Sequence, residues 1–485
     1  MPLTAKVMNP AFAGSTKAKM YTSDAPEQIR ELPGDEKEDV LFDTLFGLRT
    51  VELNRPKVLN SLNGSMVRKI VPRLQEWAKS DMANVVVIKG AGEKAFCAGG
   101  DVTSLAKDNK LGEEGQQRSI DYFALEYKLD HLIATYTKPY VAIMDGFTMG
   151  GGVGLSLHAP FRIATEKTVF AMPETTIGFF PDVGASFFLP RMAGATGMYL
   201  ALTSERLTGV NVYYAGIATH YIHSTSLPAL ERRLAELRFN DYDSLDERLD
   251  LIDSTIEEYT TGLPHDQPML LSGPLRRAID ACFSADTLNE VVKRLSNHHA
   301  QSGPIVQWAE KTLLALKSRS PTSLHVTFQQ MKLGRKWSIK ETFQREHQIA
   351  SKFMRHPDFT EGVDALLIRK DKTPNWAEPS KLEDVQNPAD LTRPFFEVDK
   401  GKTLKLLTKG DFEDYPHRRF GLPNEGQIES IVKKGNRTIP EVVGHFVREK
   451  RGKQGVKEMV EEVLARRAYS VEGGKAAWYG SESTE

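Results

Sequence analysis

The stretch KPYVAIMDGFTMGGGVGLS, residues 138–156, indicates most directly how this chain folds. Its first half contains Tyr140–Met144, a short apolar run after a Lys-Pro pair, which is typical of a buried strand. Its second half contains the glycine cluster 149–154, where a strand is expected to give way to a helix. Consecutive glycines leave backbone N–H groups uncovered, and the following helix adds its positive end. The stretch therefore predicts a turn that can hold a negatively charged oxygen.

A second glycine turn precedes this one. Residues 95–101 read AFCAGGD, and residues 85–89, VVVIK, form another apolar, β-branched run before them. One N–H group from each turn would suffice to bind a single carbonyl oxygen, as needed to stabilise an enolate or a tetrahedral intermediate. Each cluster alone also fits an ordinary tight turn. The two together favour a carbonyl-binding site.

Two carboxylates lie in the apolar stretch MPETTIGFFPDVG, residues 172–184. Burial would raise the pKa of Glu174 toward neutral pH, which suits a base or a nucleophile. Asp182 could act in the same way or hold a substrate hydroxyl. The structural alternative puts Glu174 in the first turn of a helix and Asp182 in a simple turn. The glycine turns favour the catalytic interpretation, whereas Glu126, in an expected helix, would by spacing alone be a surface carboxylate.

Other kinds of site fit the sequence less well. No G-x-S-x-G elbow occurs, which argues against the common serine-hydrolase arrangement. Cys97 adjoins a glycine turn without a histidine in motif relation, so we expect a small buried residue there. His220-x-x-His223 and His298-His299 lack acidic or cysteine partners in the sequence, and we predict no metal. The cluster 149–154 also lacks the G-x-G-x-x-G pattern of a dinucleotide site.

Composition sets the class of protein. The chain has 485 residues, 40% hydrophobic and 26% charged, with a mean hydropathy of -0.37. These values are typical of a globular protein with more than one unit, and no apolar run is long enough for a membrane span. Lys and Arg total 63 against 64 Asp and Glu, so only a local basic patch could attract nucleic acid. Two cysteines indicate a reducing compartment such as the cytosol or the mitochondrial matrix.

Changes in composition divide the chain into five parts. Residues 1–40 are expected to be an N-terminal lead, compatible with a presequence remnant, that ends in the charged run 35–39. Residues 41–225 hold the strand and turn signals, and 226–380 turn helical and complete the core. Residues 381–400 are expected to be a linker. Residues 401–485 are expected to be a separate extension, in which 433–467 carry ten basic residues against five acidic ones.

At these motifs the chain resembles the crotonase, or enoyl-CoA hydratase/isomerase, family, in its branch of 3-hydroxyisobutyryl-CoA hydrolases. The resemblance runs from about residue 41 through AFCAGGD, KPYVAIMDGFTMGGGVGLS, FRIATEK, FAMPETTIGFFPDVGASFFLPR, ALTSERLTG and AGIATHYI to SPTSL and DKTPNW. The segment FPDVG marks the hydrolase branch. The resemblance implies an α/β fold, a crotonase-like spiral of β-β-α units with C-terminal helices, to which this chain adds an extension.

The resemblance also implies roles for individual residues. The N–H groups of Gly100 and Gly151 would bind the thioester carbonyl oxygen of an acyl-CoA. Glu174 would be the catalytic carboxylate, as base or nucleophile, Asp182 would hold the substrate hydroxyl and assist, and Glu126 would contact substrate. No cofactor is implied, because coenzyme A is part of the substrate. The implied reaction is hydrolysis of 3-hydroxyisobutyryl-CoA in valine catabolism. Hydratases carry a second glutamate where this chain has Gly154, which disfavours water addition to a double bond.

The extension implies a second role. Some fungal-type relatives with a similar tail are components of the small subunit of the mitochondrial ribosome, and a basic tail would suit rRNA or ribosomal proteins. Charged faces of short helices explain the same composition. We therefore expect a hydrolase of the mitochondrial matrix, with a structural role in the mitochondrial ribosome as the alternative or additional function.

Overall fold

The computed structural model describes residues 29–240, 242–299, 303 and 305–479, and two β-sheets form its centre. The larger sheet has the order β1-β2-β3-β5-β7-β10 and is parallel except for β1; the smaller has the order β4-β6-β8-β9 and is parallel except for β9. The strands are β1 Val40–Leu45, β2 Leu48–Leu53, β3 Val85–Gly90, β4 Ala95–Cys97, β5 Tyr140–Met144, β6 Phe147–Met149, β7 Phe161–Ala164, β8 Val169–Ala171, β9 Leu207–Thr208 and β10 His220–Tyr221.

The chain passes between the two sheets in a repeated order. Strand β3 of the larger sheet is followed by β4 of the smaller one, β5 by β6, and β7 by β8, and each pair leads into a helical segment. These segments begin with α2 Val102–Asn109 and α3 Glu113–Ala134, α4 Gly151–Leu157, and 3-10 helix η4 Glu174–Ile177 with α5 Ala185–Phe188 and α6 Thr196–Thr203. This is the predicted spiral of β-β-α units.

Helices cover both faces of the larger sheet. Alternate residues of β3 point to opposite faces, as a strand requires. Val86 and Ile88 pack with α1 (Gly64–Lys79) and α3, whereas Val85 and Val87 pack with α8 (Leu227–Ala235) and α9 (Leu245–Glu257). Burial on both faces explains why the parallel strands read as continuous apolar runs.

A third group of helices completes the core beside the smaller sheet. It includes α13, whose N-cap Ser320 accepts a hydrogen bond from Ser323 N at 3.0 Å. No helix of the described residues is long and apolar enough to cross a membrane. The remaining helices of this part are α7 Val210–Tyr214, α10 Gly273–Phe283, α11 Leu288–His299, α12 Ile305–Lys317, α13 Pro321–Gly334, α14 Ile339–Phe353, α15 Pro357–Val363, the π-helix η7 Asp364–Ile368 and α16 Pro388–Phe396.

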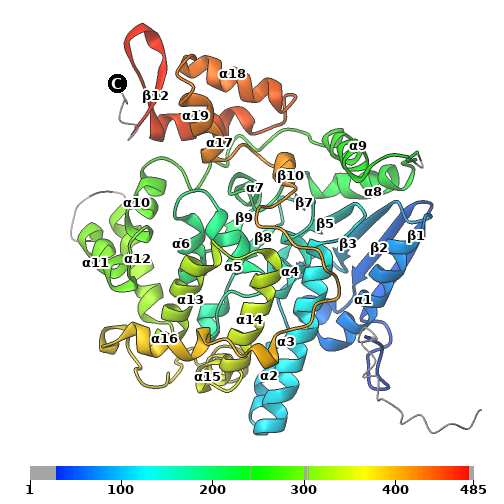
Figure 1. The fold of residues 1–485 in the computed structure, drawn as a ribbon, viewed down its shortest axis with the longest axis vertical. Coiled ribbons are helices and arrows are strands. Elements are labelled where there is room, and N and C mark those ends of the chain that lie inside the picture. Colours follow the sequence, from blue (N-terminus) through cyan, green and yellow to red (C-terminus); the bar gives the residue numbers. More distant parts are fainter. Residues whose placement is uncertain (1–28, 241, 300–302, 304, 480–485) are drawn as a thin grey trace, which may run out of the picture.

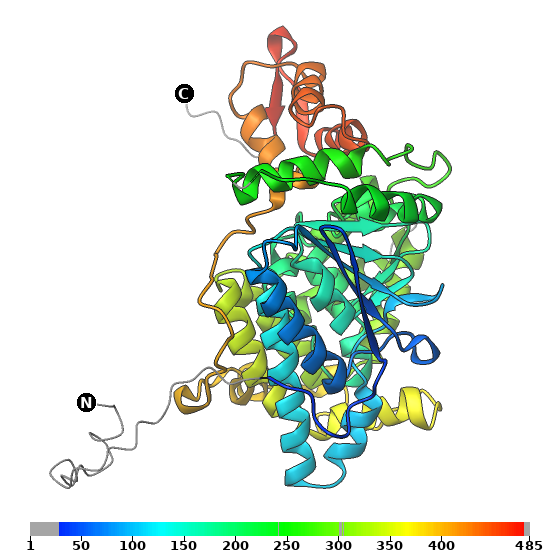
Figure 2. The ribbon, with the colours of Figure 1, turned by 90° about the vertical axis from the view of Figure 1, so that its right-hand side faces the viewer.

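The C-terminal residues form a strap and a cap. The strap, residues 397–424, runs up the side of the core in both views (Figures 1 and 2), and its Gly410 carbonyl oxygen lies 3.0 Å from His131 Nε2 on α3. The cap lies beyond α8 and α9 at the end of the molecule (Figure 2). It consists of α17 Glu425–Val432, α18 Ile439–Glu449, α19 Val456–Arg467 and the hairpin β11 Ala468–Ser470 with β12 Ala476–Trp478.

The structure corrects three boundary predictions. The charged run 35–39 is anchored, because Asp35 pairs with Arg68 and the buried Asp39 pairs with Lys69, both on α1. The predicted linker 381–400 contains α16, and Phe395 of that helix is buried. The extension is not a separate unit, because buried side chains of α18 and α19 belong to the same apolar cluster as those of α6 and α13. The predicted presequence remnant lies mostly outside the described residues.

Candidate functional site

The two glycine turns follow β4 and β6 of the smaller sheet and lie against each other at the ends of these strands. A Cβ atom on Gly99, whose φ is +110°, would lie 3.6 Å from the carbonyl oxygen of Met149, and a Cβ on Gly151 would lie 3.4 Å from Gly100 N. Gly152 leaves no room for a side chain, since a Cβ there would be 2.2 Å from the Cys97 carbonyl oxygen. The absence of side chains therefore lets the two turns approach closely.

This approach places the N–H groups of the turns near one another. Gly151 is the first residue of α4, so its N–H has no acceptor within that helix. The Gly100 nitrogen is close to Gly151, since it would lie 3.4 Å from a Cβ atom built on Gly151. The structure thus brings together the two residues that the resemblance assigns to the oxyanion hole.

Glu174 lies over the second turn. It follows β8 as the first residue of η4, and its Oε1 would be 3.0 Å from a Cβ atom on Gly150. The side chain is only 5% exposed, and its Oε2 has no hydrogen-bond partner among the described residues. A buried carboxylate oxygen without a partner costs free energy, which is typical of a group that acts on a ligand.

Asp182 and Glu126 reach the same place from different elements. Tyr127 Oη on α3 donates to Asp182 Oδ2 at 2.6 Å. Glu126, the preceding residue of α3, points its Oε1 at the second turn, where a Cβ on Gly151 would be 2.4 Å away. Both carboxyl groups are buried. Glu126 is therefore buried beside the second glycine turn, a placement that its helical spacing could not indicate.

Burial raises the pKa values of Glu174, Asp182 and Glu126, and repulsion between the carboxyl groups contributes at Glu174 and Glu126. Burial raises the pKa of Glu174 well above its usual value, and the charge of Asp182 adds to the effect. Burial also raises the pKa of Asp182 to about 7, although the hydrogen bond from Tyr127 opposes this. The pKa of Glu126 is raised by burial and then by Asp182. Carboxyl groups with raised pKa values can exchange a proton with substrate or water.

The loop that carries Asp182 is fixed by residues that sequence reasoning missed. Glu346 on α14 accepts hydrogen bonds from Gly184 N at 2.7 Å, from Ser186 N at 2.9 Å and from Ser186 Oγ at 2.6 Å. Gln330 on α13 donates to the carbonyl oxygen of Pro181 at 2.6 Å. The C-terminal helices therefore hold both ends of the Asp182 loop.

Asp130 could not be identified from the sequence either, and its position explains why residue 154 is a glycine. A Cβ atom on Gly154 would lie 2.6 Å from Asp130 Oδ2. Asp130 is fully buried on α3, and neither carboxylate oxygen has a hydrogen-bond partner among the described residues. The space that a glutamate at position 154 would need is thus filled by a different carboxyl group, whose pKa is raised by burial and by Glu126.

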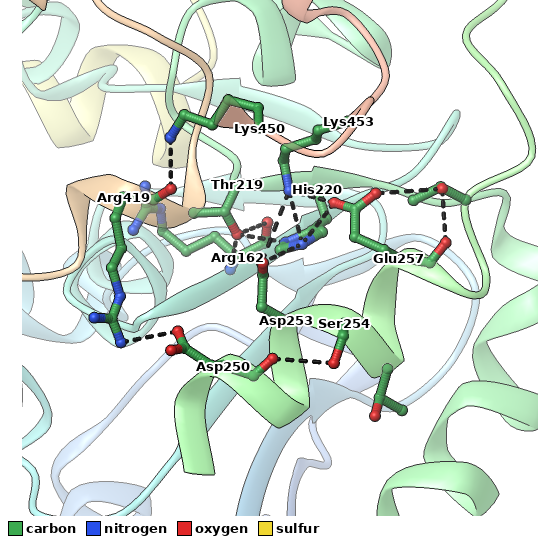
Figure 3. A network of polar contacts seen from close by, with 12 residues as sticks. Arg162, Thr219, His220, Asp250, Asp253, Ser254, Glu257, Arg419, Lys450 and Lys453 are labelled. Atoms are coloured by element: carbon green, nitrogen blue, oxygen red, sulfur yellow. Dashed lines mark hydrogen bonds and ion pairs between the residues drawn. The ribbon is translucent and has the colours of Figure 1, made fainter. Parts of the chain in front are cut away.

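The structure also shows what surrounds Cys97 and His220, the possible nucleophile and the possible metal ligand. Cys97 is buried, as expected, and burial raises its pKa to about 12, so it holds no thiolate at neutral pH. His220 does have acidic neighbours, which sequence spacing did not reveal: its Nε2 lies 3.1 Å from Asp253 Oδ1 and 3.1 Å from Glu257 Oε1, both on α9. These three side chains could hold a metal ion, but the Lys453 ammonium lies among them, 2.9 Å from His220 Nε2 (Figure 3).

The arrangement of the two sheets and their helices is a fold of the crotonase type. A model of the enoyl-CoA hydratase/isomerase family matches residues 48–395, and the chain belongs to this family. The crystal structure of a carnitinyl-CoA dehydratase from Mycobacterium thermoresistibile superposes with a TM-score of 0.65 at 31% identity, covering 77% of this chain and all of that one. An enoyl-CoA hydratase from Rhodobacter sphaeroides gives a TM-score of 0.63 at 31% identity, covering 76% and 100%. The predicted fold is confirmed.

Within the family the chain is similar to two kinds of protein. It is 56% identical to the small ribosomal subunit protein mS47 of Neurospora crassa, over 98% of this chain and 93% of that protein. It is 40% identical to mS47 of Schizosaccharomyces pombe, over 78% and 86%. It is 44% identical to the mitochondrial 3-hydroxyisobutyryl-CoA hydrolase of Gallus gallus, over 73% and 88%. The predicted resemblance to both groups is confirmed.

Proposed function

We propose that this protein is a component of the small subunit of the mitochondrial ribosome and that it lies in the mitochondrial matrix. The observation that carries this proposal is the extent of the similarity. The match to the Neurospora mS47 protein covers 98% of the chain, whereas the match to the Gallus hydrolase covers 73%. The ribosomal function, expected from the sequence as the alternative, thus becomes the first proposal and hydrolysis the second.

Exposed cations on the cap support contact with rRNA. Of the ten basic residues in 433–467, Lys453 and Arg466 are buried, and Arg467 pairs with Glu425. Others face solvent, among them Lys434, Arg448 and Arg451. Such side chains can neutralise RNA phosphates, and the binding that results weakens steeply as salt rises.

Charge reversal on the cap tests this proposal in the full chain. We expect Arg448→Glu/Arg451→Glu to abolish cosedimentation with the mitochondrial small subunit at a salt concentration that retains the unaltered protein. The control Lys79→Glu/Arg232→Glu makes the same change in net charge at exposed positions on α1 and α8, and should still cosediment. A protein that never sediments with the subunit, even at low salt, would exclude the ribosomal proposal.

We propose as a second function the hydrolysis of a β-hydroxyacyl-CoA thioester, with 3-hydroxyisobutyryl-CoA as the expected substrate. The convergence of Glu174 and Asp182 on the two glycine turns supports it. The N–H groups of Gly100 and Gly151 would bind the thioester oxygen, while Asp182 and Glu126 would contact the rest of the acyl group. Water would supply the hydroxyl of the acid, the C–S bond would break, and the proton from water would leave with the thiol of coenzyme A. Glu174 would serve as base or as nucleophile.

Thiol release from 3-hydroxyisobutyryl-CoA tests the second function. Glu174→Gln should lower kcat by about 10²-fold or more, because the amide neither accepts a proton nor attacks a carbonyl. Circular dichroism should show the unaltered fold. The same preparation should not hydrate crotonyl-CoA. Equal turnover by the Gln variant would rule the proposal out.

A further inference from the structure

A cleft of about 440 Å³ opens beside the candidate active site. Met149 and Pro173 line it, and these residues directly precede Gly150 and Glu174. The other walls come from the ends of α6 and α12, from α15 with η7, and from the loop after η7. The cleft is thus assembled from distant segments at the ends of β6 and β8.

Three cations from three of these segments line the cleft, and no acidic residue does. They are Arg206 after α6, Arg319 after α12 and Lys372 after η7. Neither Arg206 nor Lys372 forms an ion pair with any residue that the structure describes. Three like charges around one concavity repel one another, so an arrangement of this kind favours an anionic ligand.

The acidic residues nearest in sequence are occupied elsewhere. Glu205 pairs with Lys311 at 2.8 Å, although it adjoins Arg206. Asp371, which adjoins Lys372, pairs with Arg369 at 2.9 Å. Asp364 of η7 pairs with Lys110 at 2.5 Å. The positive charge of the cleft is therefore not neutralised by its neighbours in the chain.

The Arg319 guanidinium is desolvated by the protein and has no carboxylate beside it among the residues that the structure describes. Its Nη1 donates to Ser318 Oγ at 3.0 Å, but its Nε is buried without a hydrogen-bond partner. Burial lowers the pKa of this guanidinium to about 10, and no carboxylate compensates. A cation that is desolvated without a counter-ion destabilises the fold unless a ligand supplies the missing charge.

We propose that this cleft binds phosphate groups of a ligand through Arg206, Arg319 and Lys372. Guanidinium groups form paired hydrogen bonds to phosphate oxygens, and an ammonium adds a point charge. The hydroxyls of Thr176 and Ser318 line the same cleft but already donate to backbone carbonyl oxygens, whereas the Ser204 hydroxyl can donate to a ligand when it accepts from Thr175. Two sources can supply the phosphates: the nucleotide end of an acyl-CoA, which rests on the proposed thioester function, or a free phosphate compound such as pyrophosphate.

Calorimetric titration of the full chain with coenzyme A, pantetheine and inorganic pyrophosphate tests this proposal. The variant is Arg206→Ala/Lys372→Ala, which alters two exposed side chains and spares Arg319, whose Nε is buried. The control is Lys370→Ala, because Lys370 lies in the same loop, has a similar positive φ of 61° and does not line the cleft.

The outcomes separate the sources. A loss of about tenfold or more in coenzyme A affinity, with pantetheine and the control unchanged, supports the site and identifies the acyl-CoA as the source. The same loss for pyrophosphate alone supports the site with a free phosphate compound. Equal affinities of wild type and double variant for both phosphate ligands, or no binding of either, overturn the proposal. Turnover of the thioester is measured separately, so failure of the hydrolase proposal does not imitate any of these results.

Discussion

Asp182 combines a buried position with a pKa near neutrality, and this combination has a consequence for stability. Because burial raises its pKa to about 7 in the folded chain, the folded state holds a proton that the unfolded state has lost. The stability from this group is therefore present at pH 4 and is lost as the pH rises toward 7, by up to ~1.4 kcal/mol per pH unit. We predict that Asp182→Asn removes this loss.

Urea denaturation of both proteins between pH 4 and pH 8 measures the effect. The difference in unfolding free energy between Asp182→Asn and wild type should grow in favour of the variant as the pH increases. Glu174 and Glu346 titrate in both proteins, and the loss of the Asp182 charge lowers their pKa values in the variant, which changes the difference in the same direction. A difference that stays constant with pH would contradict the prediction.

Glu346 gives a prediction about positioning. Its carboxylate is the acceptor for Gly184 N, Ser186 N and Ser186 Oγ, and burial raises its pKa to about 8. Glu346→Ala would leave buried donors without partners at about 1–3 kcal/mol each and would loosen the loop that carries Asp182. We expect lower unfolding free energy together with a loss of kcat in any thioester turnover.

Glu346→Gln separates these effects. The amide keeps an acceptor oxygen for the loop, so it should restore most of the stability and turnover that Ala loses. Glu341→Ala on the same helix is the control, because that side chain pairs with Arg345 away from the loop. Equal losses in the Gln and Ala variants would show that Glu346 does not position the loop by hydrogen bonding.

Local sequence could indicate some of these residues and not others. Glu174 stands beside apolar residues and after a strand, so its burial followed from its neighbours. Glu346 lies 164 residues after Asp182 in an amphipathic helix that also carries exposed acids, and nothing in that pattern marks it. Helical spacing likewise makes Glu126 an ordinary surface residue; only the packing of α3 on the glycine turns buries it.

At the scale of elements, the contact between α3 and α4 depends on Gly154. Since a Cβ there would lie 2.6 Å from Asp130 Oδ2, Gly154→Ala should overpack this contact and destabilise the chain by about 1–3 kcal/mol. Asp130→Ala should relieve the clash, so the double variant should be more stable than the sum of the single effects. Urea denaturation of the four proteins measures the coupling.

A matched control is Gly34→Ala, where a Cβ meets nothing within 4 Å. It should change stability by a few tenths of a kcal/mol and should not couple to Asp130→Ala. If the effects at 154 and 130 simply add, the two side chains do not compete for the same space.

Elements with strong periodicity or apolar runs could be predicted, whereas polar connecting segments could not. The parallel strands were visible because both faces are buried. The segment 381–400 looked like a linker, because it holds five acids and two prolines. The structure places one of those prolines, Pro388, at the start of α16, where proline suits a helix, and buries Phe395 near its end. Phe395 and Leu382 both belong to the apolar cluster, so two buried side chains bring this segment into the core.

At the scale of the whole molecule, the cap is joined to the core by charge as well as by apolar packing. Lys453, in the loop between α18 and α19, inserts its ammonium among His220, Asp253 and Glu257 (Figure 3). The side-chain amide of neighbouring Gln454 donates to the carbonyl oxygen of Tyr221 at 2.7 Å. The backbone carbonyl oxygen of Gln454 accepts from Tyr213 Oη, also at 2.7 Å. The sequence showed only an excess of basic residues here. Which of them face the core depends on how the cap is docked.

This docking predicts that Lys453 matters more for stability than the other lysines of the cap. Lys453→Met keeps the apolar stem but leaves two carboxylates and a buried histidine without their cation. Both carboxylates are about one-third exposed, so water screens part of the cost, and we expect a loss of about 1–3 kcal/mol in unfolding free energy. Lys457→Met is the control, because that exposed lysine only approaches Glu461, at 3.9 Å. Urea denaturation should show a near-neutral control, and limited proteolysis should release the cap first in Lys453→Met. Equal effects of the two substitutions would mean that apolar packing alone holds the cap in place.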